Sequence, residues 1–102
     1  MGAILSIAGL SCWFNTLHHD AQARVTVSLV RLERGNTSAA KSVGAGVFEL
    51  RLDFGPGYRI YFGRDGDQIM VLLGGGSKKR QQADIDAARA LWQEYKKRRR
   101  EE

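Results

Sequence analysis

The sequence predicts an α+β fold in which an antiparallel three-stranded meander packs against amphipathic helices. Residues 47–76 contain three runs rich in Val, Ile, Leu, Phe and Tyr, separated by the turn-forming clusters Gly55-Pro56-Gly57 and Asp65-Gly66. Apolar runs divided by such clusters are typical of consecutive hairpins. Helical patterns with three-to-four spacing precede and follow them. We therefore expect a single α+β domain over residues 1–102.

The stretch before the meander predicts a short strand followed by two helices. Residues 3–7 form an apolar candidate strand at the edge of the sheet. Large apolar side chains recur at three-to-four spacing over residues 10–17, which predicts a short amphipathic helix. A second helix is predicted from an N-cap at Asp20 to about Arg34, because Asp is a favoured N-cap and Gly35 is a favoured helix stop.

Two further segments flank the meander. Residues 35–46 are rich in Gly, Ala and Ser, and we expect a connecting loop in which Lys41 is the one charged residue. Residues 82–99 carry apolar side chains on one stripe and are expected to form the last helix. The basic residues near its end favour the negative end of the helix dipole.

Alternation in the first strand of the meander predicts which side chains share a face. If Gly55-Pro56-Gly57 is a three-residue loop, Arg51 lies opposite Tyr61 and Asp53 lies opposite Arg59. This register keeps apolar pairs on one face and charged pairs on the other. We expect the Asp53–Arg59 pair at the end of the sheet, where water screens it and it adds little stability.

The second hairpin is predicted to turn at Asp65-Gly66, a pair suited to a tight two-residue loop. This turn places Ile60 opposite Val71, so that Val71 and Leu73 join one apolar face across all three strands. Leu72 is then expected at the far side of the other face. Because that other face carries two arginines and a tyrosine, it is expected to be an open surface that reads phosphate.

The charge balance favours a polyanionic partner. The chain has 16 Lys and Arg residues against 11 Asp and Glu residues, a formal net charge of +5. Its single cysteine, Cys12, excludes an internal disulfide and a Cys-rich metal site, and a reducing cytoplasm is the simplest setting. No stretch is long enough to span a membrane.

Two short motifs, in this order and spacing, carry a resemblance to a known family. Glu49-Leu50-Arg51 is followed by Gly55-Pro56-Gly57-Tyr58-Arg59, and the likeness extends from Trp13 to Asp84-Ile85. The chain resembles the RelE/ParE superfamily of bacterial toxins, and within it the HigB-like, phage-derived "addiction module killer" branch. It departs from the pattern at Ser77, where an acidic residue is usual, and at Lys79-Arg80, where Ser-Thr is usual.

The resemblance implies a β-α-α-β-β-β-α fold and a cytoplasmic toxin of a type II toxin–antitoxin system, neutralised by a helix-turn-helix antitoxin. It implies a cofactor-free mRNA endoribonuclease, an mRNA interferase, that acts in the ribosome and halts translation. A ParE-like toxin that inhibits DNA gyrase without chemistry of its own is the alternative. A relic whose activity has decayed is a third possibility, because of the departures at residues 77–80. No metal, small-molecule cofactor or membrane is expected.

RNA cleavage needs groups that stabilise charge on the phosphate and transfer protons, because the 2′-hydroxyl supplies the nucleophile. The meander face offers Arg51 and Arg59, which we expect to stabilise charge, and Tyr61, which we expect to stack on or orient the substrate. Lys41 and Lys78 are the candidates for acid or base. Two further cations are expected to bind RNA, namely Lys79 and Arg80.

The competing interpretation of the same face is purely structural. Arg59 opposite Asp53, and Arg51 beside Glu49, would form a solvated lattice of ion pairs worth a few tenths of a kcal/mol each, roughly the value for exposed cross-strand pairs. The motifs alone leave this alternative open.

Overall fold

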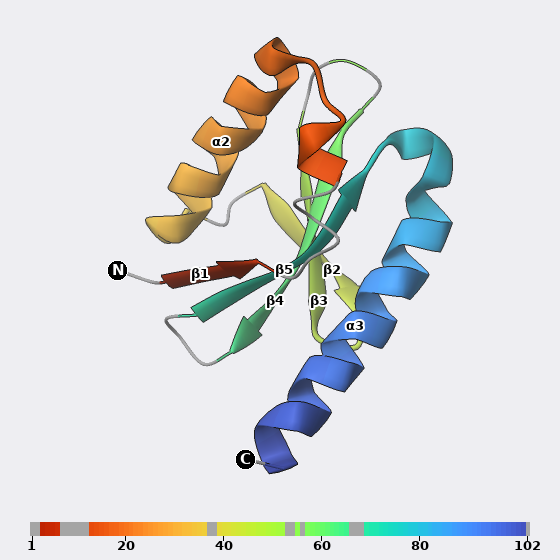
Figure 1. The fold of residues 1–102 in the computed structure, drawn as a ribbon. Helices are drawn as coiled ribbons and strands as arrows, with labels where there is room; N and C mark the ends of the chain where they lie inside the picture. The colour runs from red at the N-terminus through yellow and green to blue at the C-terminus, as the bar shows by residue number, and fades with distance from the viewer. Residues whose placement is uncertain are drawn as a thin grey trace.

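The chain has an α+β fold, as predicted, in which five strands form one sheet in the order β1-β5-β4-β3-β2 (Figure 1). The computed structural model describes residues 3–6, 13–36, 39–52, 55, 57–65 and 69–101. Its elements are β1 (Ala3–Ser6), α2 (His19–Glu33), β2 (Ala40–Gly44), β3 (Val47–Arg51), β4 (Arg59–Asp65), β5 (Ile69–Gly76), the 3-10 turn η1 (Lys78–Arg80) and α3 (Gln81–Glu101). Among the described residues, no helix is long and apolar enough to cross a membrane.

The first strand and the last helix lie where the sequence predicts them. β1 occupies one edge of the sheet and pairs with β5 in parallel. α3 begins one residue before the expected start and continues two residues past the expected end. Residues 13–15 are helical, within the short helix expected over residues 10–17, while residues 10–12 lie outside the described residues.

Helix α2 begins two residues earlier than the sequence predicts, so the expected N-cap is wrong. His18 is the N-cap, and its Nδ1 accepts a hydrogen bond of 3.3 Å from the backbone N–H of Asp20. Asp20 is instead part of the first turn, where its carboxylate favours the positive end of the helix dipole. Gly35 has a φ of +91° and ends the helix as expected.

Residues 35–46 are not a simple loop, which corrects the sequence-based expectation. Ala40–Gly44 forms β2, an edge strand that pairs with β3 in an antiparallel manner. The two strands are joined at Ala45 and Gly46, whose φ angles of 58° and 83° suit a tight hairpin turn. Small residues without an apolar alternation gave no strand signal, yet they suit an exposed edge strand.

The predicted register of the first meander hairpin is wrong by two residues. Glu49, not Arg51, lies opposite Tyr61, and Arg51 lies opposite Arg59. The Leu52 N–H donates a 2.9 Å hydrogen bond to the carbonyl of Tyr58, so the connection is longer than Gly55-Pro56-Gly57. A shift of two residues keeps each side chain on its predicted face, because side chains alternate with a period of two. Asp53 lies outside the described residues.

The predicted register of the second hairpin is also wrong, and here the faces of β5 exchange. Asp65 pairs with Ile69, so Phe62 lies opposite Leu72 rather than Ile69, and an irregularity between Tyr61 and Phe62 then places Tyr61 opposite Gly74. Leu72 therefore joins the core formed by Ile60 and Phe62, whereas Val71 and Leu73 pack on the other face. A strand that is apolar on both sides does not reveal its register through alternation.

Both faces of the sheet are covered by helices, so the expectation of one open, charged face is wrong (Figure 1). On the α2 side, Val25 and Leu32 pack against Leu50, Ile60 and Phe62 among others. On the opposite side, α3 buries Tyr61 and neighbouring apolar residues under Ile85, Ala88 and Trp92. The charged residues on this second face therefore lie beside, and partly beneath, the start of α3.

Candidate functional site

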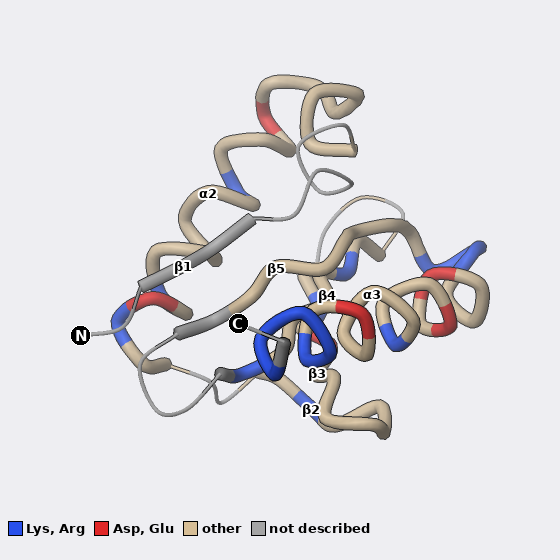
Figure 2. The backbone as a smooth tube through the Cα atoms, turned by 60° about the horizontal axis from the view of Figure 1, so that its bottom comes forward, with Lys and Arg blue, Asp and Glu red and all other residues tan. Residues whose placement is uncertain are grey.

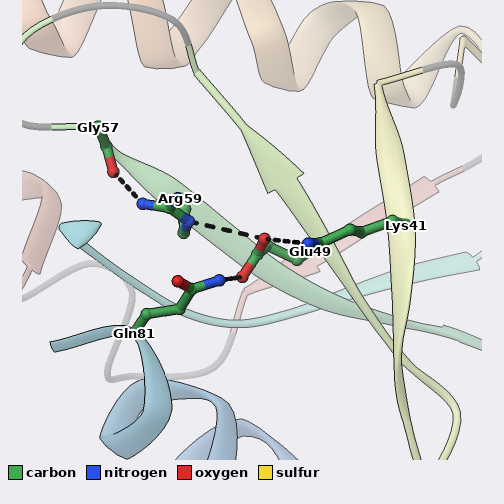
Figure 3. Close-up of polar contacts among 5 residues, drawn as sticks. All are labelled: Lys41, Glu49, Gly57, Arg59 and Gln81. Carbon is green, nitrogen blue, oxygen red and sulfur yellow. Dashed lines mark hydrogen bonds and ion pairs between the residues drawn. The ribbon is translucent and has the colours of Figure 1, made fainter. Parts of the chain in front are cut away.

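The centre of the candidate site is a carboxylate buried in the middle of β3. Glu49 is 1% exposed, and two cations approach its Oε1 atom (Figure 3). The Nε of Arg59 on β4 lies 3.6 Å from this oxygen, and the Nζ of Lys41 on β2 lies 3.8 Å from it. Gln81, the first residue of α3, donates a 2.8 Å hydrogen bond from Nε2 to Oε2 of Glu49. The Glu49 carboxylate therefore links β2, β3 and β4 to the start of α3.

Arg59 is held in place from both ends of its guanidinium. Besides its ion pair with Glu49, it donates a 2.7 Å hydrogen bond from Nη1 to the carbonyl of Gly57 in the preceding loop. The residue is only 3% exposed, so water does not screen the pair as it would at a surface. The expectation of a solvated Arg59 is therefore wrong, and its ion partner is Glu49.

Tyr61 and Asp84 lie next to this ion pair. Burial raises the pKa of the Tyr61 hydroxyl, and the negative charges of Glu49 and Asp84 raise it further, whereas Arg59 opposes the shift. Tyr61 is consequently neutral at physiological pH. Burial also raises the pKa of the Asp84 carboxyl, with Arg80 acting against the shift. One oxygen of each residue, Oη of Tyr61 and Oδ2 of Asp84, has no hydrogen-bond partner among the described residues.

Exposed cations surround the buried centre. The Lys41 side chain is 61% exposed although its Nζ reaches toward Glu49. The three residues of η1, Lys78–Arg80, are exposed and precede Gln81 directly. Lys78 lies beside the loop that holds Arg59. A Cβ atom added to Gly57 in that loop would lie 3.4 Å from the Cβ of Lys78. Figure 2 shows the basic segment Lys78–Arg80 where the chain enters α3.

The structure brings together most, but not all, of the sequence-predicted site residues. Lys41, Arg59 and Tyr61 converge on Glu49, and Lys78 lies beside them. Arg51 is different, because it is exposed at the end of β3 and lines a hollow of about 550 Å³ beside α2. We name this the α2 hollow, and its lining also includes Arg24 and Arg31.

Three residues of the site were missed by the sequence-based selection, namely Glu49, Gln81 and Asp84. Alternation placed Glu49 on the same face as Arg59, but a single strand pattern does not tell a buried carboxylate from a solvated one. Gln81 and Asp84 lie three residues apart at the start of α3 and so share one helix face. In the sequence, two polar residues on one helix face directly after a basic run could have indicated a site. This pattern does not show which face of the sheet the helix covers.

Comparison with known proteins gives the family. A family model described as phage-derived protein, Gp49-like, matches residues 12–96. The chain belongs to the Gp49-like family. It is also similar to an uncharacterized protein of Haemophilus influenzae, with 41% identity over 83 residues that cover 80% of this chain and 84% of the relative.

The Gp49-like match includes the whole candidate site. Every residue from Lys41 on β2 to Asp84 on α3 lies within the matched segment. The phage-derived part of the sequence-based resemblance is therefore confirmed. The wider RelE/ParE assignment, and the roles that it implies for the site residues, remain predictions.

Proposed function

We propose that this Gp49-like chain is the toxin of a type II toxin–antitoxin system and that it cleaves mRNA, in the ribosome, without a cofactor. One observation carries the proposal: Lys41 and Arg59 converge on a single buried carboxylate oxygen of Glu49, with Lys78 beside them. A fixed, buried arginine beside exposed lysines suits a phosphodiester in which negative charge develops. The resemblance to RelE/ParE toxins supports the same chemistry.

The buried residues supply rigidity and the exposed ones supply contact. Glu49 is a positioning residue, because its two oxygens orient Lys41, Arg59 and Gln81. Arg59 contributes positive charge from a fixed place in a poorly solvated setting, where electrostatic interactions are stronger than in water. Tyr61 is neutral and buried beside Glu49, so its expected part is to hold the neighbouring charged groups in position rather than to act as a base.

The exposed lysines are the groups that can meet the substrate. In the proposed reaction the 2′-hydroxyl attacks the adjacent phosphorus, its proton is withdrawn, and the departing 5′-oxygen receives a proton. Lys41 and Lys78 lie at the rim and are our candidates for phosphate contact and proton transfer. Lys79 and Arg80 extend the basic rim and are proposed to bind RNA. Arg51, near the α2 hollow, is proposed to contact RNA further from the reacting phosphate.

The proposed partners follow from the same charges. A helix-turn-helix antitoxin would neutralise the toxin by placing acidic or apolar segments over the basic rim, or by holding α3 in place over the site. The ribosome would present mRNA to that rim. The cytoplasm is the proposed setting for both partners.

A ParE-like inhibitor of DNA gyrase is the second candidate function. It is favoured by the burial of Glu49, Arg59 and Tyr61, because the accessible part of the site is then mainly lysine and offers no acid–base pair of the usual carboxylate or histidine type. Such a surface would suffice for binding an acidic partner.

Expression without an antitoxin is expected to arrest growth through loss of protein synthesis. Pulse-labelling of newly made protein, DNA and RNA in the arrested cells measures this, with plasmid supercoiling followed in parallel. The expected result is an early fall in protein labelling while supercoiling is maintained. Continued protein synthesis with loss of supercoiling would contradict the proposed nuclease and favour the gyrase inhibitor.

A further inference from the structure

A second hollow lies along the C-terminal half of α3, away from the candidate site. It has a volume of about 450 Å³ and lies between α3 and Arg64 on β4. We name it the α3 hollow. Its lining combines aromatic rings with cations, in Arg64, Trp92, Tyr95, Lys96, Arg99 and Arg100.

The aromatic floor of the α3 hollow is rigid. Trp92 is 4% exposed and fits against Gly46 in the β2–β3 turn and Gly63 in β4. A Cβ on Gly46 would lie 2.8 Å from the indole Nε1, and a Cβ on Gly63 would collide with the six-membered ring. The indole therefore contacts backbone directly and has little room to move.

A second ring continues this floor toward the surface. Tyr95 stacks on Trp92 with ring centroids 5.3 Å apart and an interplanar angle of 12°. Tyr95 is half-buried, so part of it lies at the surface of the α3 hollow. The Lys96 Nζ lies 5.8 Å from the centroid of the Trp92 ring, within the range of a cation–π interaction. The hollow thus has a ring platform with a cation beside it.

The charge of the α3 hollow has one sign. Among the described residues that line it, four are cationic and none is acidic. The nearby acidic residue Glu94 pairs with Arg98 at 2.8 Å, and neither residue lines the hollow. Figure 2 shows the resulting concentration of basic residues at the C-terminal end of α3.

We propose that the α3 hollow binds single-stranded RNA, with Arg64, Arg99 and Arg100 contacting phosphates and Tyr95 stacking on a base. Proteins that hold single strands combine a basic groove with exposed aromatic rings, and this hollow has both features. The α2 hollow also carries arginines, but none of the described residues that line it is aromatic. The proposal concerns binding alone, so it holds whether or not the chain cleaves RNA.

The α3 hollow is far enough from the candidate site to hold a different part of the same RNA strand. Trp92 lies 11 residues after Gln81 along α3, and a helix rises about 1.5 Å per residue, so the two places are roughly 15 Å or more apart. A single strand spans that distance with a few nucleotides. RNA held in the α3 hollow can therefore extend to the basic rim without displacing any residue of the candidate site.

Binding of a 12-nucleotide, 2′-O-methylated single-stranded RNA to the full chain tests the proposal, because this probe resists cleavage. Fluorescence anisotropy over a series of salt concentrations is expected to show tenfold or greater weakening for the double variant Arg99→Ala/Arg100→Ala. The slope of log K against log salt should fall by about 1.4, or roughly 0.7 per lost phosphate contact. The matched control, Arg34→Ala/Lys97→Ala, removes the same charge from exposed positions that line neither hollow and should change binding about twofold or less.

Stacking is tested with a 2-aminopurine base in the same RNA. Binding to the parent should quench its fluorescence, Tyr95→Phe should preserve the quenching, and Tyr95→Ala should abolish it while weakening binding by at least about fivefold. Equal loss of affinity in the Arg99→Ala/Arg100→Ala variant and in the matched control would overturn the proposal, since the effect would then come from net charge. Unquenched 2-aminopurine in the parent complex would overturn it as well. The Arg99→Ala/Arg100→Ala variant and its control alter exposed side chains, so they decide the question even if Tyr95→Ala fails to fold.

Discussion

Lys41→Ala is expected to abolish toxicity and to slow mRNA cleavage by on the order of a hundredfold, roughly the cost of removing one charge-stabilising group from an active site. Stability should hardly change, because the Lys41 side chain is 61% exposed and Glu49 keeps its contacts with Arg59 and Gln81. Lys41→Arg should restore part of the activity, since arginine retains the charge but is a poor proton donor or acceptor.

The measurement for Lys41 is a pair of assays on the same preparations, thermal unfolding and mRNA cleavage in a translation extract. Lys97→Ala is the matched control, because it removes an exposed lysine of α3 that does not line either hollow. Parent-like cleavage by Lys41→Ala would remove Lys41 from the proposed chemistry. A large fall in the unfolding midpoint would show instead that Lys41 acts mainly through stability.

Arg59→Ala and Glu49→Ala are each expected to destabilise the fold strongly. Breaking a buried ion pair on one side costs about 3–5 kcal/mol, because the remaining charge is left buried without compensation. For a domain of this size, about 1 kcal/mol lowers the unfolding midpoint by roughly 4–8 °C, so a fall of well over 10 °C is expected. The solvated pair with Asp53, inferred from sequence, would have predicted a change of only a few degrees.

The double variant Glu49→Leu/Arg59→Met separates stability from function at this pair. Replacing both charges by apolar residues of similar size is often neutral for stability. We therefore expect thermal unfolding to return to within a few degrees of the parent while toxicity and mRNA cleavage remain lost. A stable double variant with full toxicity would show that the pair is only structural, and an Arg59→Ala variant that melts with the parent would contradict its burial.

The sequence predicted the fold class because its signals were local. Alternating charges in β3, Gly35 after α2 and the apolar stripe of α3 each act within one element. Register was harder, since it depends on the length of a connection. In the first hairpin the error of two residues left the faces unchanged, and so Glu49, Arg59 and Tyr61 were correctly placed on one side.

The environment of the candidate site could not be predicted in the same way. Whether Glu49 is solvated or buried depends on where α3 crosses the sheet, which is a contact between distant segments. Lys41 reached the site only because residues that looked like a loop form β2 opposite Glu49. The sequence also did not reveal which residues of β5 face α2 and which face α3. A strand that is apolar on both sides fits either register.

The chemistry of the RNA ends tests the proposed cleavage most directly. mRNA fragments from a translation extract that contains the purified chain can be examined for their terminal groups, beside an mRNA with a 2′-deoxynucleotide at the cut. Attack by the 2′-hydroxyl predicts a 2′,3′-cyclic phosphate on the upstream fragment, a 5′-hydroxyl on the downstream fragment, and resistance of the deoxy-substituted position. Intact mRNA, or fragments from cleavage at the deoxy-substituted position, would contradict the account.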